Sequence, residues 1–513
     1  MFSTPKDQLF SLIKSLTKAE KRSFKLYANR FGSGTDTKFI QLFDVIDRLP
    51  DYDEPEILKR LPEVKKHHLP NLKRHLYKQI LTSLRLIHIQ KNIDIQIREQ
   101  LDFARILYGK GMYMQSLRML DRIKKIAVDH HQDLLHLEIL EFQKTIEARH
   151  ITRSRLVENK MEALLDEAGQ RSLITHSNNL LSNFNIQVHG WYIQHGHVNN
   201  EEEISGINDF FHENRPDEFL NERSRKLTFF ERANLFQAYM WYHYILLDFE
   251  GAARYARQWV GLFHTQSLIK EKDPDLYMRS LYYLLVFLYL LREKEEFGYY
   301  LEEFRQFEAE NRDVFNDNSR MIAFTYLRLS QLNFALVSKD FKGGVQLIHE
   351  IKAELPQYLN YTDVHRTLLF YFKFAYLFFC LRQFEKALEY LNQIIHLKSG
   401  HLRDDLQINA RILHLICHYE LGNYDMLDYL TPPVKRLLDN SADVSQLPKL
   451  TLCFLEKLSR LAPLEHAEAF AAFRNELKKV TEEPFERKSL NYLDIPAWVE
   501  GHLGAGVRNS LIH

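Results

Sequence analysis

The amino-acid sequence predicts an all-α protein, built largely from helical hairpins that stack side by side. The 513 residues contain only 14 prolines and 18 glycines. The prolines stand at apparent boundaries, so long stretches are left free to form helices. Alternation of polar and apolar residues, which is typical of strands, is scarce. A short sequence motif, which we call the phrase, also recurs along the chain from about residue 94 onward.

The composition is that of a folded protein with a large core. Hydrophobic residues make up 45% of the chain and charged residues 27%, far from the composition of disordered proteins. The chain is too long for one ordinary core, which predicts several domains or an elongated array. Formal net charge is zero, yet residues 1–125 carry 25 Lys and Arg against 14 Asp and Glu. This basic head favours contact with nucleic acid or an acidic protein, or docking on its own acidic body.

The segments that would direct a protein out of the cytoplasm are not recognisable. The first residues lack a basic region followed by an apolar core, so we expect no secretory signal. The longest wholly apolar run, Leu281 to Leu291, is shorter than the roughly 20 residues of a membrane span. The three cysteines form no CxxC pair, which suits a reducing compartment. We therefore expect a cytoplasmic protein that has no membrane partner.

Residues 1–93 are predicted to form a basic N-terminal helical module. Its long helix, about Leu69 to Ile93, has an apolar stripe that includes Leu76 and Ile80. The opposite side carries Arg74, Lys78 and Arg85, which would suit a nucleic-acid backbone or an acidic partner. The alternative is an ordinary solvated helix face, and Leu81 interrupts the basic stripe.

The returning phrase begins with a polar turn and an aromatic residue. A small residue follows three positions later and an apolar residue seven positions later. We expect the turn to fold two helices back on each other, the aromatic ring to fill the gap, and the small residue to permit close approach. The copies are Tyr113/Ser116/Leu120, Phe249/Ala252/Ala256, Phe341/Gly344/Ile348 and Phe384/Ala387/Leu391, with further turns predicted at Phe297 and Tyr424.

This phrase resembles the tetratricopeptide repeat. The resemblance is carried by one stretch, with Tyr371, Phe374, Ala375 and Phe378 on a first helix and Phe384, Ala387 and Leu391 on a second. It implies a right-handed α-solenoid of about eight hairpins over residues 94–480. Turns recur every 40 to 50 residues or so, whereas the family's period is about 34, and Leu427 and Tyr300 stand where small residues are expected. Residues 481–513 are predicted to be a C-terminal capping segment and tail.

In the family that the phrase resembles, first helices line a concave groove. Arg98 and Arg105, on the first helix of the opening repeat, would then contact an acidic ligand. An aromatic set on the same kind of face would anchor a partner protein or peptide if it is exposed, or would be buried if the superhelix is tightly wound. That set comprises Trp241, Tyr244, Phe372, Tyr376 and Phe379.

No pattern in the chain specifies catalysis or a cofactor. His414 and His418 are four residues apart, a spacing that zinc sites use, but they occupy the repeat positions of Phe374 and Phe378, which pack between helices. The GxxxxGK[ST] pattern of phosphate-binding loops is missing, as are the known local signatures of nucleophiles. We therefore predict no catalytic, metal or cofactor-binding residue.

The function expected from the sequence is that of a non-enzymatic scaffold or adaptor that binds a protein or peptide on its concave face. Two alternatives stay open. One is a regulator whose basic N-terminal module binds RNA or DNA while the repeats sense a partner, and the less favoured one is a metal-dependent hydrolase. No feature of the sequence indicates whether the protein is a monomer or an oligomer.

Overall fold

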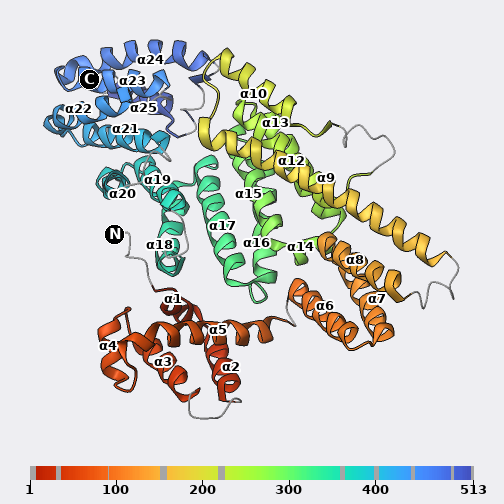
Figure 1. Ribbon diagram of the computed structural model, residues 1–513. Coiled ribbons are helices and arrows are strands. Elements are labelled where there is room, and N and C mark those ends of the chain that lie inside the picture. Colours follow the sequence, from red (N-terminus) through yellow and green to blue (C-terminus); the bar gives the residue numbers. More distant parts are fainter. Residues whose placement is uncertain are drawn as a thin grey trace. The chain divides into compact units, whose positions relative to one another are not determined.

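The computed structural model describes residues 7–29, 36–89, 92–150, 159–217, 226–358, 364–397, 404–440, 445–483, 485–486, 490 and 492–509. These residues form helices and turns, with no strand among them, so the predicted all-α class is confirmed (Figure 1). Neighbouring helices pack in pairs, as expected of a solenoid-like array. The right-handed sense of the array stays a prediction.

The chain divides into two compact units, residues 1–176 and 177–513. The division falls inside one long helix, α9 (Lys160–His195). The predicted domain boundaries at residues 93/94 and 480/481 stay predictions.

The first unit begins with a small helical module that has its own core. Its helices are α1 (Gln8–Ser15), α2 (Lys18–Ala28), α3 (Asp36–Arg48), α4 (Glu54–Arg60), a 3-10 turn at Lys66–His68, and α5 (Leu69–His88). Asp7 and Thr17 cap the first two helices by accepting hydrogen bonds from backbone N–H groups. Leu76 and Ile80 of α5 are fully buried in this core, as their stripe predicts.

Three further helices complete the first unit together with the start of α9. They are α6 (Ile93–Gly109), α7 (Tyr113–Asp129) and α8 (Asp133–His150). Ser116 of α7 is buried, and its hydroxyl donates to the carbonyl of Ala104 on α6 at 2.8 Å. The small residue of the phrase thus lies where the two helices meet.

The second unit is a series of helical hairpins around one continuous core. After the end of α9 and α10 (Glu201–Asn214), four hairpins follow, and α14 (Leu268–Lys272) stands between the first two. The hairpins are α12 (Phe229–Ile245) with α13 (Phe249–Thr265), α15 (Pro274–Leu291) with α16 (Lys294–Asn311), α17 (Asp317–Val337) with α18 (Phe341–Tyr358), and α19 (Val364–Cys380) with α20 (Phe384–His396).

The C-terminal part of the second unit continues this pattern and ends on a single helix. Its elements are α21 (Asp404–Glu420), α22 (Tyr424–Asn440), α23 (Gln446–Leu458), a 3-10 turn at Pro463–Glu465, α24 (His466–Glu482) and α25 (Ile495–Asn509). α25 packs against α24 and closes the series (Figure 1).

The hairpin turns share one backbone device. A residue with positive φ follows the end of the first helix by one or two positions. In most of these turns the N–H group of the next residue bonds to a carbonyl five positions earlier, which is the Schellman motif. Gln383, for example, donates to the carbonyl of Phe378 at 2.9 Å, after Arg382 with φ 58°. The second helix then starts on the predicted aromatic residue at Tyr113, Phe249, Phe341, Phe384 and Tyr424.

The turn predicted at Phe297 is wrong by three residues. Arg292 has the positive φ and α16 begins at Lys294, so Phe297 takes the position that a small residue holds in the other copies. Phe297 is fully buried there. In this hairpin the second helix therefore starts on Lys294 and not on an aromatic residue, so it shares only the backbone turn with the other copies.

Candidate partner-binding face

A row of tyrosines and cations crosses the first helices α15, α17 and α19 of the second unit. We call it the tyrosine–cation row, and it comprises Tyr282, Tyr283, Tyr289, Tyr326, Arg366 and Lys373. The rings of Tyr282 and Tyr326 lie nearly parallel, with centroids 4.1 Å apart. The Arg366 guanidinium lies 4.9 Å from the centroid of the Tyr326 ring and donates to the Tyr326 hydroxyl at 3.1 Å.

Helix α19 supplies both cations of the row. Arg366 and Lys373 are seven residues apart, so they share one side of the helix. The Lys373 ammonium lies 4.4 Å from the centroid of the Tyr289 ring and donates to the Tyr289 hydroxyl at 3.3 Å. Both cations therefore lie over aromatic rings of other first helices, Arg366 over a ring of α17 and Lys373 over a ring of α15.

The row is partly exposed and carries positive charge. Tyr282, Tyr283, Arg366 and Lys373 are half-buried, and Arg279, one helical turn before Tyr283 on α15, is exposed. Burial raises the pKa of Tyr283, so its phenol is neutral. Within the described ranges, neither Arg279 nor Lys373 makes an ion pair with a carboxylate. Such a surface suits a ligand with carboxylates and with flat or apolar groups that stack on tyrosine.

Part of the predicted aromatic set on α19 is covered by the end of the chain. Phe372 is only 2% exposed, and its ring lies 6.2 Å from that of Tyr492, edge to face. The backbone N–H of Asp494 donates to the hydroxyl of Tyr376 at 3.3 Å. Phe379 is half-buried and lies 6.2 Å from the Tyr376 ring. A segment more than 100 residues away thus occupies this side of α19.

Glu420, at the end of α21, anchors the same C-terminal segment. Its carboxylate is 8% exposed and accepts from the indole N–H of Trp498 at 2.6 Å and from His502 Nε2 at 2.5 Å. Burial alone would raise the pKa of Glu420, but these two hydrogen bonds outweigh it and hold the pKa below its usual value. The carboxylate is therefore ionised at neutral pH.

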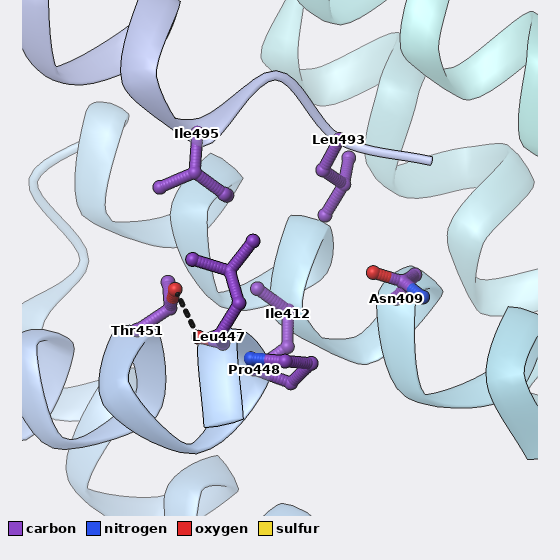
Figure 2. A pocket seen from close by; sticks show the side chains of 7 residues that line it. All are labelled: Asn409, Ile412, Leu447, Pro448, Thr451, Leu493 and Ile495. Carbon is purple, nitrogen blue, oxygen red and sulfur yellow. Dashed lines mark hydrogen bonds between the residues drawn. The ribbon is translucent and has the colours of Figure 1, made fainter. Parts of the chain in front are cut away.

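Figure 2 shows how closely this segment fits. Leu493 and Ile495 point toward Ile412 of α21 and Leu447 of α23, and Thr451 donates to the carbonyl of Leu447 at 2.8 Å. The space left between these side chains is about 10 Å³, room for at most a single water molecule. This contact is packing and leaves no ligand cavity.

The other aromatic residues predicted to bind a partner lie in the core beside the tyrosine–cation row. Trp241 is 7% exposed, with the ring of His189 stacked on it at 4.1 Å and the ring of Tyr283 edge to face at 5.2 Å. Tyr244 is half-buried among Tyr192, Phe249 and Phe287. The structure thus brings Trp241 to the edge of the row, and a role for this set in partner binding stays a prediction.

The predicted arginines of the opening repeat are engaged in ion pairs. Arg98 donates to both carboxylate oxygens of Asp94, at 2.8 and 3.3 Å, and this hydrogen bonding raises the pKa of Arg98. Arg105 donates to Glu138 at 2.6 Å. Both pairs are about half exposed. An acidic ligand would have to compete with these carboxylates.

The predicted basic stripe of α5 lies on the surface. Arg74, Lys78 and Arg85 are exposed, as is Leu81, which is 44% exposed between them. Arg85 lies 3.9 Å from Asp102, and Arg74 and Lys78 make no ion pair with another described residue. The stripe is accessible, and its contact with nucleic acid or an acidic partner stays a prediction.

The histidine pair of α21 packs in the position that the repeat alignment gives it. His414 is 7% exposed, and its Nε2 lies 3.1 Å from Oδ1 of Asn392 on α20. Burial, together with the charges of His418, Arg411 and His396, lowers the pKa of His414 to about 4. The described residues hold no group of three or more His, Cys, Asp or Glu side chains placed to bind a metal ion.

Sequence reasoning missed Tyr282, Tyr326, Arg366 and Lys373. Tyr282 and Tyr326 stand about one repeat apart, and Arg366 follows about one repeat after Tyr326, which is the signal available in the sequence. That signal was weak because it requires the correct register of α15, which the misplaced turn at Phe297 obscured. Contact between side chains of successive hairpins is not visible in any one copy.

Known proteins give no further guide to this face. No protein family has a model that matches the chain, and no curated protein matches it. No described helix is both long enough and apolar enough to cross a membrane.

Proposed function

We propose that this chain is a non-enzymatic scaffold or adaptor that binds an acidic segment of a partner protein across the tyrosine–cation row. The half-buried tyrosines supply flat surface at little entropic cost, and the cations supply charge. The observation that carries the proposal is that Lys373 lies over the Tyr289 ring and Arg279 is exposed one helical turn before Tyr283, while neither cation makes an ion pair within 4.0 Å among the described residues. A carboxylate of the partner would supply the missing charge.

Site-specific photo-crosslinking in native cells tests this proposal. A benzophenone amino acid replaces Tyr282 in the full chain, and in the control it replaces Tyr299 of α16, which is 65% exposed. We expect a discrete cross-linked partner from position 282 and none from position 299. Either no discrete product from position 282, or the same product from both positions, would contradict the proposal.

Charge reversal separates the row from the general charge of the surface. Arg279→Glu with Lys373→Glu is compared with Lys294→Glu and Lys342→Glu, which lie exposed on the second helices α16 and α18. The cross-link at position 282 is expected to disappear in the first double variant and to persist in the second. Equal loss of the cross-link in both double variants would mean that non-specific electrostatic attraction alone holds the partner, which would contradict the proposal.

We also propose a second binding activity, of the N-terminal module for RNA or DNA. Other lysines of the module are already paired, Lys21 with Asp47 and Lys25 with Asp44, both at 2.6 Å. Arg74 and Lys78 have no such partner among the described residues. They are the charges available to phosphates.

The test is fluorescence anisotropy with duplex oligonucleotides. We expect binding that weakens steeply between about 50 and 200 mM salt and that is lost in Arg74→Glu/Lys78→Glu/Arg85→Glu. The matched control reverses Arg118, Arg122 and Lys125, three exposed cations on α7. Binding that ignores salt, or that both triple variants abolish equally, would contradict this activity.

The proposed place of action is the cytoplasm. Cys380, Cys417 and Cys453 are all free thiols, which suits a reducing compartment. Fractionation of native cells tests it, with the protein expected in the cytoplasmic fraction.

A further inference from the structure

The first unit contains a polar pocket between α7, α8 and α9 that the partner-binding proposal does not use. Its volume is about 140 Å³. A cavity of about 150 Å³ is known to hold benzene, so this pocket has room for a ligand of roughly six non-hydrogen atoms. The pocket is therefore a candidate site for a small molecule.

Charged side chains from all three helices line the pocket and pair across it. Lys124 of α7 lies 2.6 Å from a carboxylate oxygen of Glu167 on α9, and Lys160 of α9 lies 3.0 Å from Glu147 on α8. Nε2 of Gln143 donates to Asp121 at 2.8 Å. These contacts fix the positions of the lining groups before any ligand binds.

Two acceptor atoms in this lining have no hydrogen-bond partner. Glu147 is 3% exposed and its Oε2 is unpaired, while Gln143 is 4% exposed and its Oε1 is unpaired. The amide orientation of Gln143 follows from its contact with Asp121, because only the nitrogen can donate to that carboxylate. Buried acceptors without donors are unfavourable, so a ligand that brings N–H groups would satisfy both.

The charge of the lining favours a cation. Three carboxylates, those of Asp121, Glu147 and Glu167, stand against the two ammonium groups of Lys124 and Lys160. Burial would raise the pKa of Glu167, but Lys124 and His136 outweigh it and keep the carboxyl ionised. Burial also lowers the pKa of His136, so its ring adds no positive charge near neutral pH.

We infer that this pocket binds a small organic cation of the guanidinium or amidinium class, whose N–H groups donate to Glu147 Oε2 and Gln143 Oε1. A planar fork of donors matches two acceptors on one helix, since Gln143 and Glu147 are four residues apart on α8. The two lysine ammonium groups oppose a bare metal ion, which also finds no cluster of ligands among the described residues.

Isothermal titration calorimetry of the full chain with methylguanidinium chloride tests the inference. We expect saturable binding at one site per chain. Tetramethylammonium chloride, a cation without N–H donors, should give no saturable heat at the same ionic strength. Glu147→Gln should weaken binding of methylguanidinium at least about tenfold, because one charge-assisted hydrogen bond is lost.

Two further variants keep the test decisive. Glu141→Gln is the matched control on α8, since Glu141 is exposed and pairs with Lys144 at 2.8 Å outside the pocket; it should bind like the unaltered chain. Ala163→Met adds a longer side chain at the exposed rim of the pocket and should block binding even if Glu147→Gln does not fold.

Three results would overturn the inference. They are no saturable methylguanidinium binding, equal binding of tetramethylammonium, and binding that survives both Glu147→Gln and Ala163→Met in folded protein. The pocket lies in the first unit and the tyrosine–cation row in the second, so failure here leaves the partner-binding proposal untouched.

Discussion

Two adjacent strips of α19, one with cations and one with aromatic residues, have different surroundings. Arg366 and Lys373 lie half-buried over tyrosines of α17 and α15. Phe372 and Tyr376 lie under the C-terminal segment that runs from Tyr492 into α25. Periodicity places residues on a face of a helix, but a segment distant in sequence decides whether that face is accessible. On this side of α19 the added polypeptide is the chain's own C-terminal segment.

The largest effect is expected from Trp498→Ala. This substitution should loosen the C-terminal segment over Phe372 and Tyr376, the covered strip of α19. The indole packs edge to face against Phe454 and Phe470 and donates to the buried Glu420. Losing this packing and leaving the carboxylate with one donor fewer should cost about 3–4 kcal/mol of stability. The measurement is urea unfolding of the full chain followed by circular dichroism.

The matched control for Trp498→Ala is Tyr429→Ala on α22, because the Tyr429 side chain is 75% exposed. Its effect should stay within about 0.5 kcal/mol. Trp498→Ala should also raise the rate at which Tyr376 is nitrated relative to Tyr282. Equal unfolding midpoints for the two variants would show that the segment contributes no stability to the covered strip.

The next largest effect concerns the pH dependence of stability, which His414 of α21 is expected to set in part. His414 has a pKa of about 4 in the folded chain and of about 6.5 when unfolded. Between these values the unfolded state binds more protons than the folded state. The contribution of His414 to the free energy of unfolding is therefore fully present above about pH 6.5 and is lost as the pH drops toward 4. At 1.36 kcal/mol per pH unit, the loss reaches about 3 kcal/mol.

Replacing His414 by Phe, the residue at the matching position of the preceding repeat, should remove most of this loss. The measurement is the urea midpoint at a series of pH values between about 4 and 7. His195→Phe, at an exposed position of α9, should leave the pH profile unchanged. An unaltered slope in His414→Phe would mean that other groups set the acid sensitivity.

The comparison of the two strips also shows how far the sequence could be interpreted. Most hairpin turns and the small residues at Ser116, Ala252, Gly344 and Ala387 were predictable, because each depends on residues within one copy of the phrase. The contact of Arg366 with Tyr326 joins successive hairpins, and that of Tyr376 with Asp494 joins residues 118 positions apart. The first contact leaves only the weak signal of residues about one repeat apart and the second leaves none, so neither the row nor its covered neighbour could be derived.

A smaller effect is expected where α18 approaches α17 and α19 closely. A Cβ atom on Gly344 would lie 2.8 Å from Cδ2 of Leu377 and 3.0 Å from Cβ of Ala335. Gly344→Ala should therefore destabilise the chain by about 1–2 kcal/mol. Gly261→Ala, in the interior of α13 with nothing within 4 Å of the added atom, should stabilise it by about 0.5–1 kcal/mol.

The expected changes in stability have opposite signs although both substitutions replace glycine by alanine in a helix. Helix propensity alone therefore cannot explain the result. Thermal unfolding by circular dichroism measures both variants under the same conditions. A stabilising Gly344→Ala would show that α17, α18 and α19 move apart easily. In that case the spacing of the row would not depend on this close contact.

The smallest effect is expected at the positive-φ turn position of two hairpins, one beside each end of the α19 hairpin in the sequence. Lys339, between α17 and α18, has φ 59°, and Gly422, between α21 and α22, has φ 74°. A side chain is strained at positive φ and glycine is not. Lys339→Gly should therefore stabilise the chain by about 0.5 kcal/mol, and Gly422→Lys should destabilise it by about 1 kcal/mol. Midpoints of urea unfolding measure both, and a loss of stability in Lys339→Gly would mean that the lysine side chain makes a contact that outweighs its backbone strain.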